Sequence, residues 1–140
     1  MKALRESAGF SLLEVLASIT VFAVAAAGLS TATVGTLRAN TNSRDISAAT
    51  ALVQDKIEQL RALDPTANPA DLRAGSHSDT LNPMTPLGAA GGYFTRTWVV
   101  TSSTPQLGLG EAVVTVTWRR AGTSRSVRAV TYFCQSSTCS

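Results

Sequence analysis

The feature that most constrains the fold of this sequence is the absence of proline from residue 10 to residue 64. Pro65 and Pro69 follow at once, and because proline ends or kinks a helix, we expect one long helix that ends near Asp64. At about 1.5 Å per residue, such a helix reaches roughly 80 Å, which no compact domain of this size can bury. The helix must therefore serve two environments.

The two halves of this run differ in chemistry. Residues 10–37 carry one charge, Glu14, and form a longer apolar segment than the roughly 20 residues that a membrane span needs. Residues 38–64 are amphipathic, which predicts that this half covers a sheet with a stripe formed by Ile46, Ala49, Val53, Ile57, Leu60 and Leu63 or Asp64. Between the halves, residues 40–43 are poor helix formers and predict a kink or a locally melted turn.

The rest of the chain predicts a loop and then a small antiparallel sheet. Residues 65–92 are dense in Pro, Gly, Asn, Asp and Ser and read as a loop, with at most one short turn of helix. Strands are predicted at 93–101, 111–119 and 126–133, and residues 120–125, with Gly122, form a tight hairpin between the last two. Val114, Val116 and Trp118 share one strand face, which suits a sheet covered on one side by the helix. The expected fold class is α+β.

The N-terminus and the cysteines indicate export. Residues 1–9 carry Lys2 and Arg5 against Glu6, a short basic leader of the kind that stays in the cytoplasm. Cys134 and Cys139 lie close together at the other end, and outside the cytoplasm they would most simply form a disulfide, with two free thiols as the alternative. The net charge of +3 is too small to imply an anionic partner.

Glu14 is the residue that needs explanation. A charge at the centre of a membrane helix costs roughly 2.5 kcal/mol or more unless something pairs with it. Secretory cleavage after the apolar stretch, near residues 25–27, would leave Glu14 unexplained and discard half of the helix. Cleavage between Gly9 and Phe10 instead creates an α-amine four residues from Glu14, or within reach of it in a neighbouring subunit. Such a buried ion pair favours assembly, because removing one partner leaves the other charge buried and unpaired, which destabilises the structure by roughly 3–5 kcal/mol.

The segment GFSLLEVL at residues 9–16 resembles the class III signal of type IV prepilins and type II secretion pseudopilins. The resemblance implies that a prepilin peptidase of the inner membrane cuts after Gly9 and N-methylates Phe10, and that Glu14 aids recruitment into a filament. It further implies the pilin fold, in which residues 10–37 form the membrane and filament-core helix. The implied partners are other major and minor pilins, through that helix, and the assembly platform protein.

Two features indicate the subtype of pilin: a difference from the sequence pattern of major pilins and a second resemblance, to minor pilins. Major pilins usually have a helix-kinking proline at mature position 22, where this sequence has Thr31. The segment ALVQDKIEQLRAL at residues 51–63 is similar to minor pilins of the PilV type and to minor pseudopilin I of type II secretion. We therefore expect a minor type IV pilin that primes a pilus or lies near its tip, in adhesion, motility or DNA uptake. The alternatives are a minor pseudopilin and an anchored periplasmic binding domain that never assembles.

Nothing in the sequence indicates catalysis, a cofactor or a metal site. His77 lies among Ser and Asp in a predicted loop, and triads assemble from residues far apart in sequence. One histidine and two cysteines at C-x4-C supply too few zinc ligands. The sheet region carries excess arginine, and Arg119, Arg120 and Arg125 are the residues that would contact DNA or another anion, although a solvated sheet face is the favoured interpretation. The expected location is the inner membrane, crossed once with the C-terminal part periplasmic, and then a pilus or pseudopilus.

Overall fold

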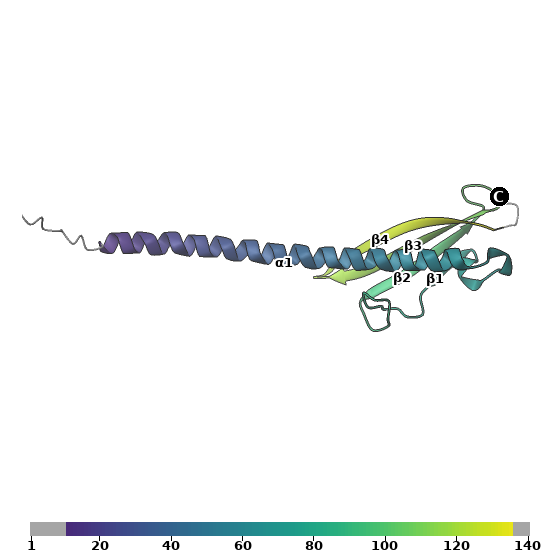
Figure 1. The fold of residues 1–140 in the computed structure, drawn as a ribbon, viewed down its shortest axis with the longest axis horizontal. Helices are drawn as coiled ribbons and strands as arrows, with labels where there is room; N and C mark the ends of the chain where they lie inside the picture. The colour runs from purple at the N-terminus through teal and green to yellow at the C-terminus, as the bar shows by residue number, and fades with distance from the viewer. Residues whose placement is uncertain (1–10, 136–140) are drawn as a thin grey trace, which may run out of the picture. The chain divides into compact units, whose positions relative to one another are not determined.

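A computed structural model describes residues 11–135 of the chain. Along this part, one long helix, α1, is followed by two short 3-10 helices and four strands, β1 to β4 (Figure 1). The chain divides into two compact units, Met1–Asn42 and Ser43–Ser140, and α1 contributes to both. The first unit is helical wherever it is described beyond Ser11, and the second holds the sheet.

Helix α1 spans Leu12–Ala62 and is helical through residues 40–43, so the expected melted turn is not present. Asn and Thr are poor helix formers, but each lowers helix stability by well under about 1 kcal/mol, too little to break a helix of 51 residues. The C-terminal end of α1 at Ala62 agrees with the prediction that Pro65 ends the helix near Asp64. Asp64 accepts a hydrogen bond from the Thr66 N–H and caps the next helix, whose first residue is Pro65.

Residues 65–92 are more structured than predicted. They form the 3-10 helices η1 (Pro65–Ala67) and η2 (Ala70–Leu72) and the strand β1 (Gly75–Ser78). The prediction of a loop without a strand was therefore wrong. The sequence Gly-Ser-His-Ser has no β-branched residue, and it is a strand because it pairs along its whole length with β2.

The sheet is an antiparallel meander in the order β1-β2-β3-β4. Strands β3 (Leu109–Arg120) and β4 (Thr123–Cys134) contain and extend the second and third predicted strands, and β2 (Phe94–Ser102) is the first predicted strand shifted by one residue. The predicted hairpin is present. Its two turn residues, Ala121 and Gly122, both have positive φ, as a two-residue turn between twisted strands requires.

One face of the sheet is buried under the second half of α1. Ala49, Leu52, Val53 and Leu60 of the helix form a single core with alternate residues of the strands, among them Phe94, Trp98, Val114, Val116 and Trp118. The predicted face of β3 is thus correct, and the α+β prediction is confirmed. One member of the predicted helix stripe is wrong: Ile46 is 40 % exposed, and Asp45 is buried in its place.

Candidate functional site

Glu14 lies in the first turn of α1, exposed at the start of the apolar half. The Ser11 carbonyl accepts the N–H of Glu14 at 3.0 Å and that of Val15 at 3.2 Å, so the helix begins directly after Ser11. A carboxylate in the first turn of a helix is stabilised by the N–H groups there. Within residues 11–135 no cation pairs with the Glu14 carboxylate. Its charge is therefore available to a group outside this part of the chain.

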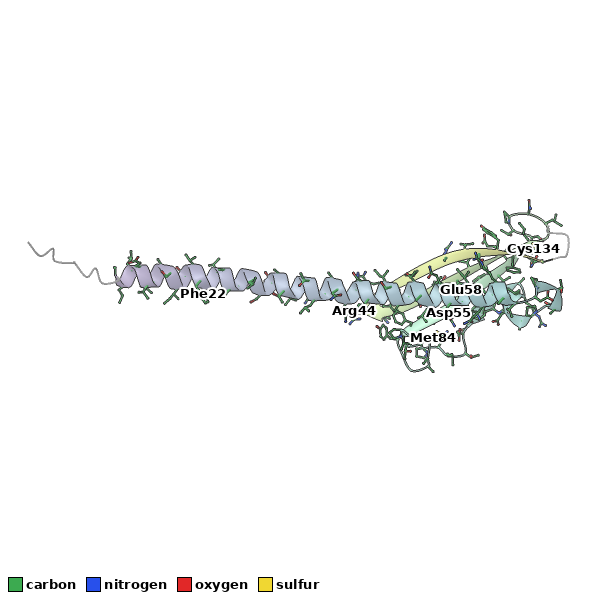
Figure 2. All side chains as sticks on the ribbon, viewed as in Figure 1. Phe22, Arg44, Asp55, Glu58, Met84 and Cys134 are labelled. Atoms are coloured by element: carbon green, nitrogen blue, oxygen red, sulfur yellow. The ribbon has the colours of Figure 1, made fainter. Side chains whose placement is uncertain are left out.

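The apolar half of α1 is uncovered along its whole length. Every residue from Ser11 to Ala39 is exposed, and Phe22, 75 % exposed, projects outward from the helix (Figure 2). Within the described residues, α1 is the one helix long and apolar enough to cross a membrane. A helix that is apolar on all sides needs lipid or other helices around it.

The hydroxyl groups in this half are satisfied by the helix itself. Ser18 donates to the Glu14 carbonyl at 2.8 Å, Thr31 to the Gly28 carbonyl at 2.8 Å and Thr33 to the Leu29 carbonyl at 2.9 Å. Such bonds to the preceding turn leave no hydroxyl in need of water, which suits an apolar environment. Glu14 is thus the only group from residue 12 to residue 37 that a dry environment would leave with an uncompensated charge.

Three residues of the predicted site lie outside the described residues: Gly9, Phe10 and Cys139. Cys134 is the last residue of β4 and is half-buried. The cleavage and methylation site and the Cys134–Cys139 disulfide therefore stay predictions.

The three arginines of the predicted anion contact are not equivalent. Arg120 forms an ion pair with the buried Asp45 of α1, which also accepts a hydrogen bond from the Tyr93 hydroxyl at 2.8 Å. The Asp45 bond raises the pKa of Arg120, and burial together with the nearby Asp45 raises the pKa of Tyr93. Arg119 and Arg125 are exposed and have no carboxylate partner among residues 11–135. The turn of the hairpin is thus fastened to α1 through Arg120.

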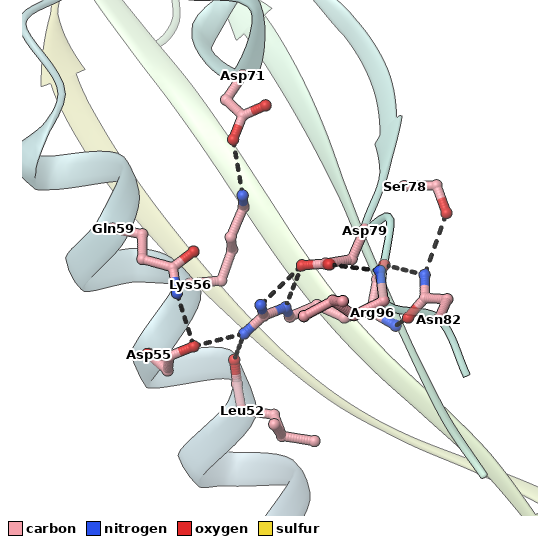
Figure 3. Close-up of polar contacts among 10 residues, drawn as sticks. Leu52, Asp55, Lys56, Gln59, Asp71, Ser78, Asp79, Asn82 and Arg96 are labelled. Carbon is pink, nitrogen blue, oxygen red and sulfur yellow. Dashed lines mark hydrogen bonds and ion pairs between the residues drawn. The ribbon is translucent and has the colours of Figure 1, made fainter. Parts of the chain in front are cut away.

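Arg96, which adds to the arginine excess in the sequence, is 3 % exposed and lies between α1 and the sheet. Its guanidinium binds Asp79 at 2.7 and 3.0 Å, Asp55 at 2.8 Å and the Leu52 carbonyl at 2.9 Å (Figure 3). Burial would raise the pKa of Asp79, but the Leu81 N–H and the Arg96 guanidinium outweigh burial, so this pKa lies below its ordinary value.

Lys56 is the second buried cation of the interface between helix and sheet. Its ammonium binds Asp71 at 2.8 Å and lies 3.7 Å from the centre of the Trp98 ring. The Trp98 indole N–H donates to the Asp71 carbonyl at 2.9 Å, and His77 stacks on the same indole at 5.3 Å. His77 is therefore part of a structural cluster, and its neighbour is the Trp98 ring and not a nucleophilic side chain.

These buried charges were missed by reasoning from the sequence, although one signal was present. Alternation along β2 places Arg96 on the same face as Phe94 and Trp98, so a period of two predicts a buried arginine there. The helical period that selects Ala49 and Val53 likewise selects Asp45 and Lys56.

A family model described as the prokaryotic N-terminal methylation motif matches residues 4–30, which include the proposed cleavage point and the start of α1. No curated protein and no solved structure shows a significant match to the chain. The motif points to a structural family rather than to an enzyme. The motif overlaps the start of α1, the one helix among the described residues that is long and apolar enough to cross a membrane, on a chain with an α+β pilin-like fold. These findings support a type IV prepilin-like protein and fit a single pass through the inner membrane before the protein joins a filament.

Proposed function

We propose that this protein is a minor type IV pilin, a structural subunit that primes a pilus or lies near its tip. The observation that carries the proposal is Glu14, a carboxylate without a cation partner among residues 11–135, on a helix whose every other side chain from residue 12 to residue 37 suits an apolar environment.

Processing supplies the partner that Glu14 needs. Cleavage after Gly9 leaves an α-amine on Phe10, and methylation of this amine by the same peptidase preserves its positive charge. When the helix leaves lipid and enters a bundle of similar helices, the amine of the incoming or neighbouring subunit pairs with Glu14. In a bundle that excludes water, this ion pair selects the correct position of the incoming subunit, because a misplaced subunit leaves both charges unpaired.

A minor rather than a major role is supported by the character of the helix. Major pilins usually interrupt it with a proline at mature position 22, whereas here Thr31 occupies that position and donates a hydrogen bond to the Gly28 carbonyl without a break in α1. A subunit with an unbroken helix packs differently from its proline-kinked neighbours. This difference suits the few positions at the start of a filament better than the repeating shaft.

Two other functions fit the same signal. A minor pseudopilin of a type II secretion system uses the same cleavage and the same helix, and it would act with secretion components instead of pilus components. A periplasmic binding domain that stays anchored in the membrane would not need Glu14. Loss of pili, loss of exoprotein secretion or neither, in a strain that lacks this protein, distinguishes the three.

The first test is the intact mass and the N-terminal sequence of the protein from native membranes, with and without the prepilin peptidase. We expect a chain that begins at N-methylated Phe10 only when the peptidase is present. A chain that begins at Met1 in both strains, or near Gly28, would refute the proposal.

The second test separates processing from assembly. Glu14→Gln keeps the size of the side chain and removes its charge, so we expect normal cleavage and loss of most incorporation into sheared filaments. Ser18→Ala, one turn along the same exposed helix, is the matched control and should assemble normally. Normal incorporation of Glu14→Gln would contradict the assembly role of Glu14, whereas absence of the unaltered protein from sheared filaments would favour the non-assembling anchor.

A further inference from the structure

The two edges of the sheet are very different. At one edge β1 has four residues, and at the other β4 has twelve. Figure 1 shows β4 at the outer side of the sheet, with β3 as its neighbour. An exposed edge of this length presents a row of unpaired backbone groups to which another extended chain can bind.

The register of the hairpin identifies these groups. Arg120 and Thr123 close the two-residue turn, so their backbones form a hydrogen-bonded pair, and such pairs alternate along the ladder. The odd-numbered residues of β4 therefore bind β3. The even-numbered residues turn their N–H and C=O groups outward: Ser124, Ser126, Arg128, Val130 and Tyr132. No backbone group of residues 11–135 pairs with this outward row.

Two common protections of an edge strand, proline and a β-bulge, are missing here. Strand β4 contains no proline and no glycine, and its register with β3 runs through twelve consecutive pairs without a bulge. Val127 and Ala129 beside the edge are only partly buried, and on the other face Val130 is 40 % and Tyr132 51 % exposed. An added strand would cover apolar surface on both faces.

The charge of the edge selects its occupant. Strand β4 carries Arg125 and Arg128 and no acid, and neither arginine has a carboxylate partner among residues 11–135. Four of the acids in this unit are already engaged with Lys56, Arg96 and Arg120. Pairing of β4 with β4 of a second copy would bring like charges together, which is destabilising for neighbours across strands.

We infer that the free edge of β4 binds an extended, acidic segment of a partner protein, which adds a fifth strand to the sheet. Backbone hydrogen bonds to the outward row give the affinity, and carboxylates beside Arg125 and Arg128 give the selectivity. This inference uses residues of the sheet unit alone and does not rest on the proposed function.

The test uses the full chain in non-ionic detergent micelles and a synthetic ten-residue peptide of Thr-Glu-Glu repeats, which has glutamates on both faces of an added strand. Amide hydrogen exchange is read residue by residue by NMR. We expect exchange at Ser126, Arg128 and Val130 to slow by about tenfold or more, while Val127 and Ala129, already bonded to β3, change little. The matched peptide with lysine in place of each glutamate should have no effect.

Two variants make the test specific to the edge. Val130→Pro removes one outward N–H, which an edge strand tolerates, and should weaken peptide binding by about tenfold, whereas Val130→Thr keeps the N–H and should bind normally. Arg128→Glu should reverse the preference between the glutamate and lysine peptides. Unchanged exchange at Val127 and Ala129 in the absence of peptide checks that each variant is folded.

Several outcomes would overturn the inference. They are equal binding of both peptides, slowing that does not alternate along β4, and protection that appears without peptide as the protein concentration rises, which would indicate a second copy. Binding of a DNA duplex that depends on Arg125 and Arg128, with no binding of the acidic peptide, would identify these arginines as a nucleic-acid contact instead.

Discussion

Replacing Arg96 with methionine tests whether its buried ion pairs hold the helix on the sheet. Methionine keeps a long unbranched side chain but removes the cation from Asp79, whose side chain is 9 % exposed, and from Asp55, which is 56 % exposed. An exposed pair contributes about 0–1 kcal/mol, whereas a buried partner left alone costs about 3–5 kcal/mol. We therefore expect the free energy of unfolding to fall by about 3–5 kcal/mol, nearly all of it through Asp79.

The two tryptophans provide the assay. Trp98 and Trp118 are each 3 % exposed and are the only tryptophans in the chain, so their fluorescence reports unfolding of the sheet unit in a urea titration of the full chain in non-ionic micelles. Arg119→Met is the matched control. This arginine is exposed and without a carboxylate partner among residues 11–135, so its loss should change stability by less than about 0.5 kcal/mol.

A second variant tests the stated cause. If the loss in Arg96→Met comes from an unpaired buried charge, adding Asp79→Asn removes that charge and should recover most of the stability. A loss below about 1 kcal/mol in Arg96→Met would contradict the reasoning. So would a double variant as unstable as Arg96→Met alone, because the loss would then come from packing.

Three further predictions concern the same unit and use the same urea titration. A Cβ at Gly92 would lie 1.8 Å from the Met84 carbonyl oxygen, so Gly92→Ala should lower stability by about 2–3 kcal/mol, and a loss below about 1 kcal/mol would show that this loop adjusts freely. Gly122 has a φ of 81° in the hairpin turn, so Gly122→Ala should lower stability by about 1 kcal/mol, whereas Ala121→Gly should have a smaller effect; equal losses would argue against left-handed strain. The pKa of Asp79 is lower in the folded chain than its ordinary 3.8, so its contribution is fully present above that value and disappears as the pH falls through the folded pKa. Stability should therefore decline below about pH 4 and decline less in Asp79→Asn, and identical pH profiles would contradict the assignment.

Much of the fold could be predicted because its signals are local. A long run without proline specifies α1, and the alternation of Val114, Val116 and Trp118 specifies which face of β3 is buried. Both are periodic patterns that a few neighbouring residues reveal. Strand β1 could not be found in this way, because its four residues become a strand only through pairing with β2.

The buried charges were missed for a related reason. Asp45 and Lys56 sit at core positions of α1, where a pattern of apolar residues gives no warning of an acid or a cation. Their partners, Arg120 and Asp71, are respectively 75 and 15 residues away in the chain. Nothing within one helix could show that these charges are paired. The signal around Glu14, by contrast, is contiguous in the sequence and could be read directly.

The order of these partners along the chain limits when each buried ion pair can form during export. Every residue that neutralises a buried charge of α1 follows the helix in the sequence: Asp71 pairs with Lys56, and Arg120 pairs with Asp45. A chain anchored by its first helix emerges from the membrane with α1 ahead of the strands. Until β3 follows, the sheet-facing side of α1 carries charges that still require water.

The meander makes the later steps quick, since each strand pairs with the one before it and only short loops must close. The ion pair of Asp45 can form only after Arg120, the last residue of β3, has been exported. A chain that stops before this residue would leave Asp45 without its cation. The buried charges of α1 are therefore all paired only after β3 has been exported.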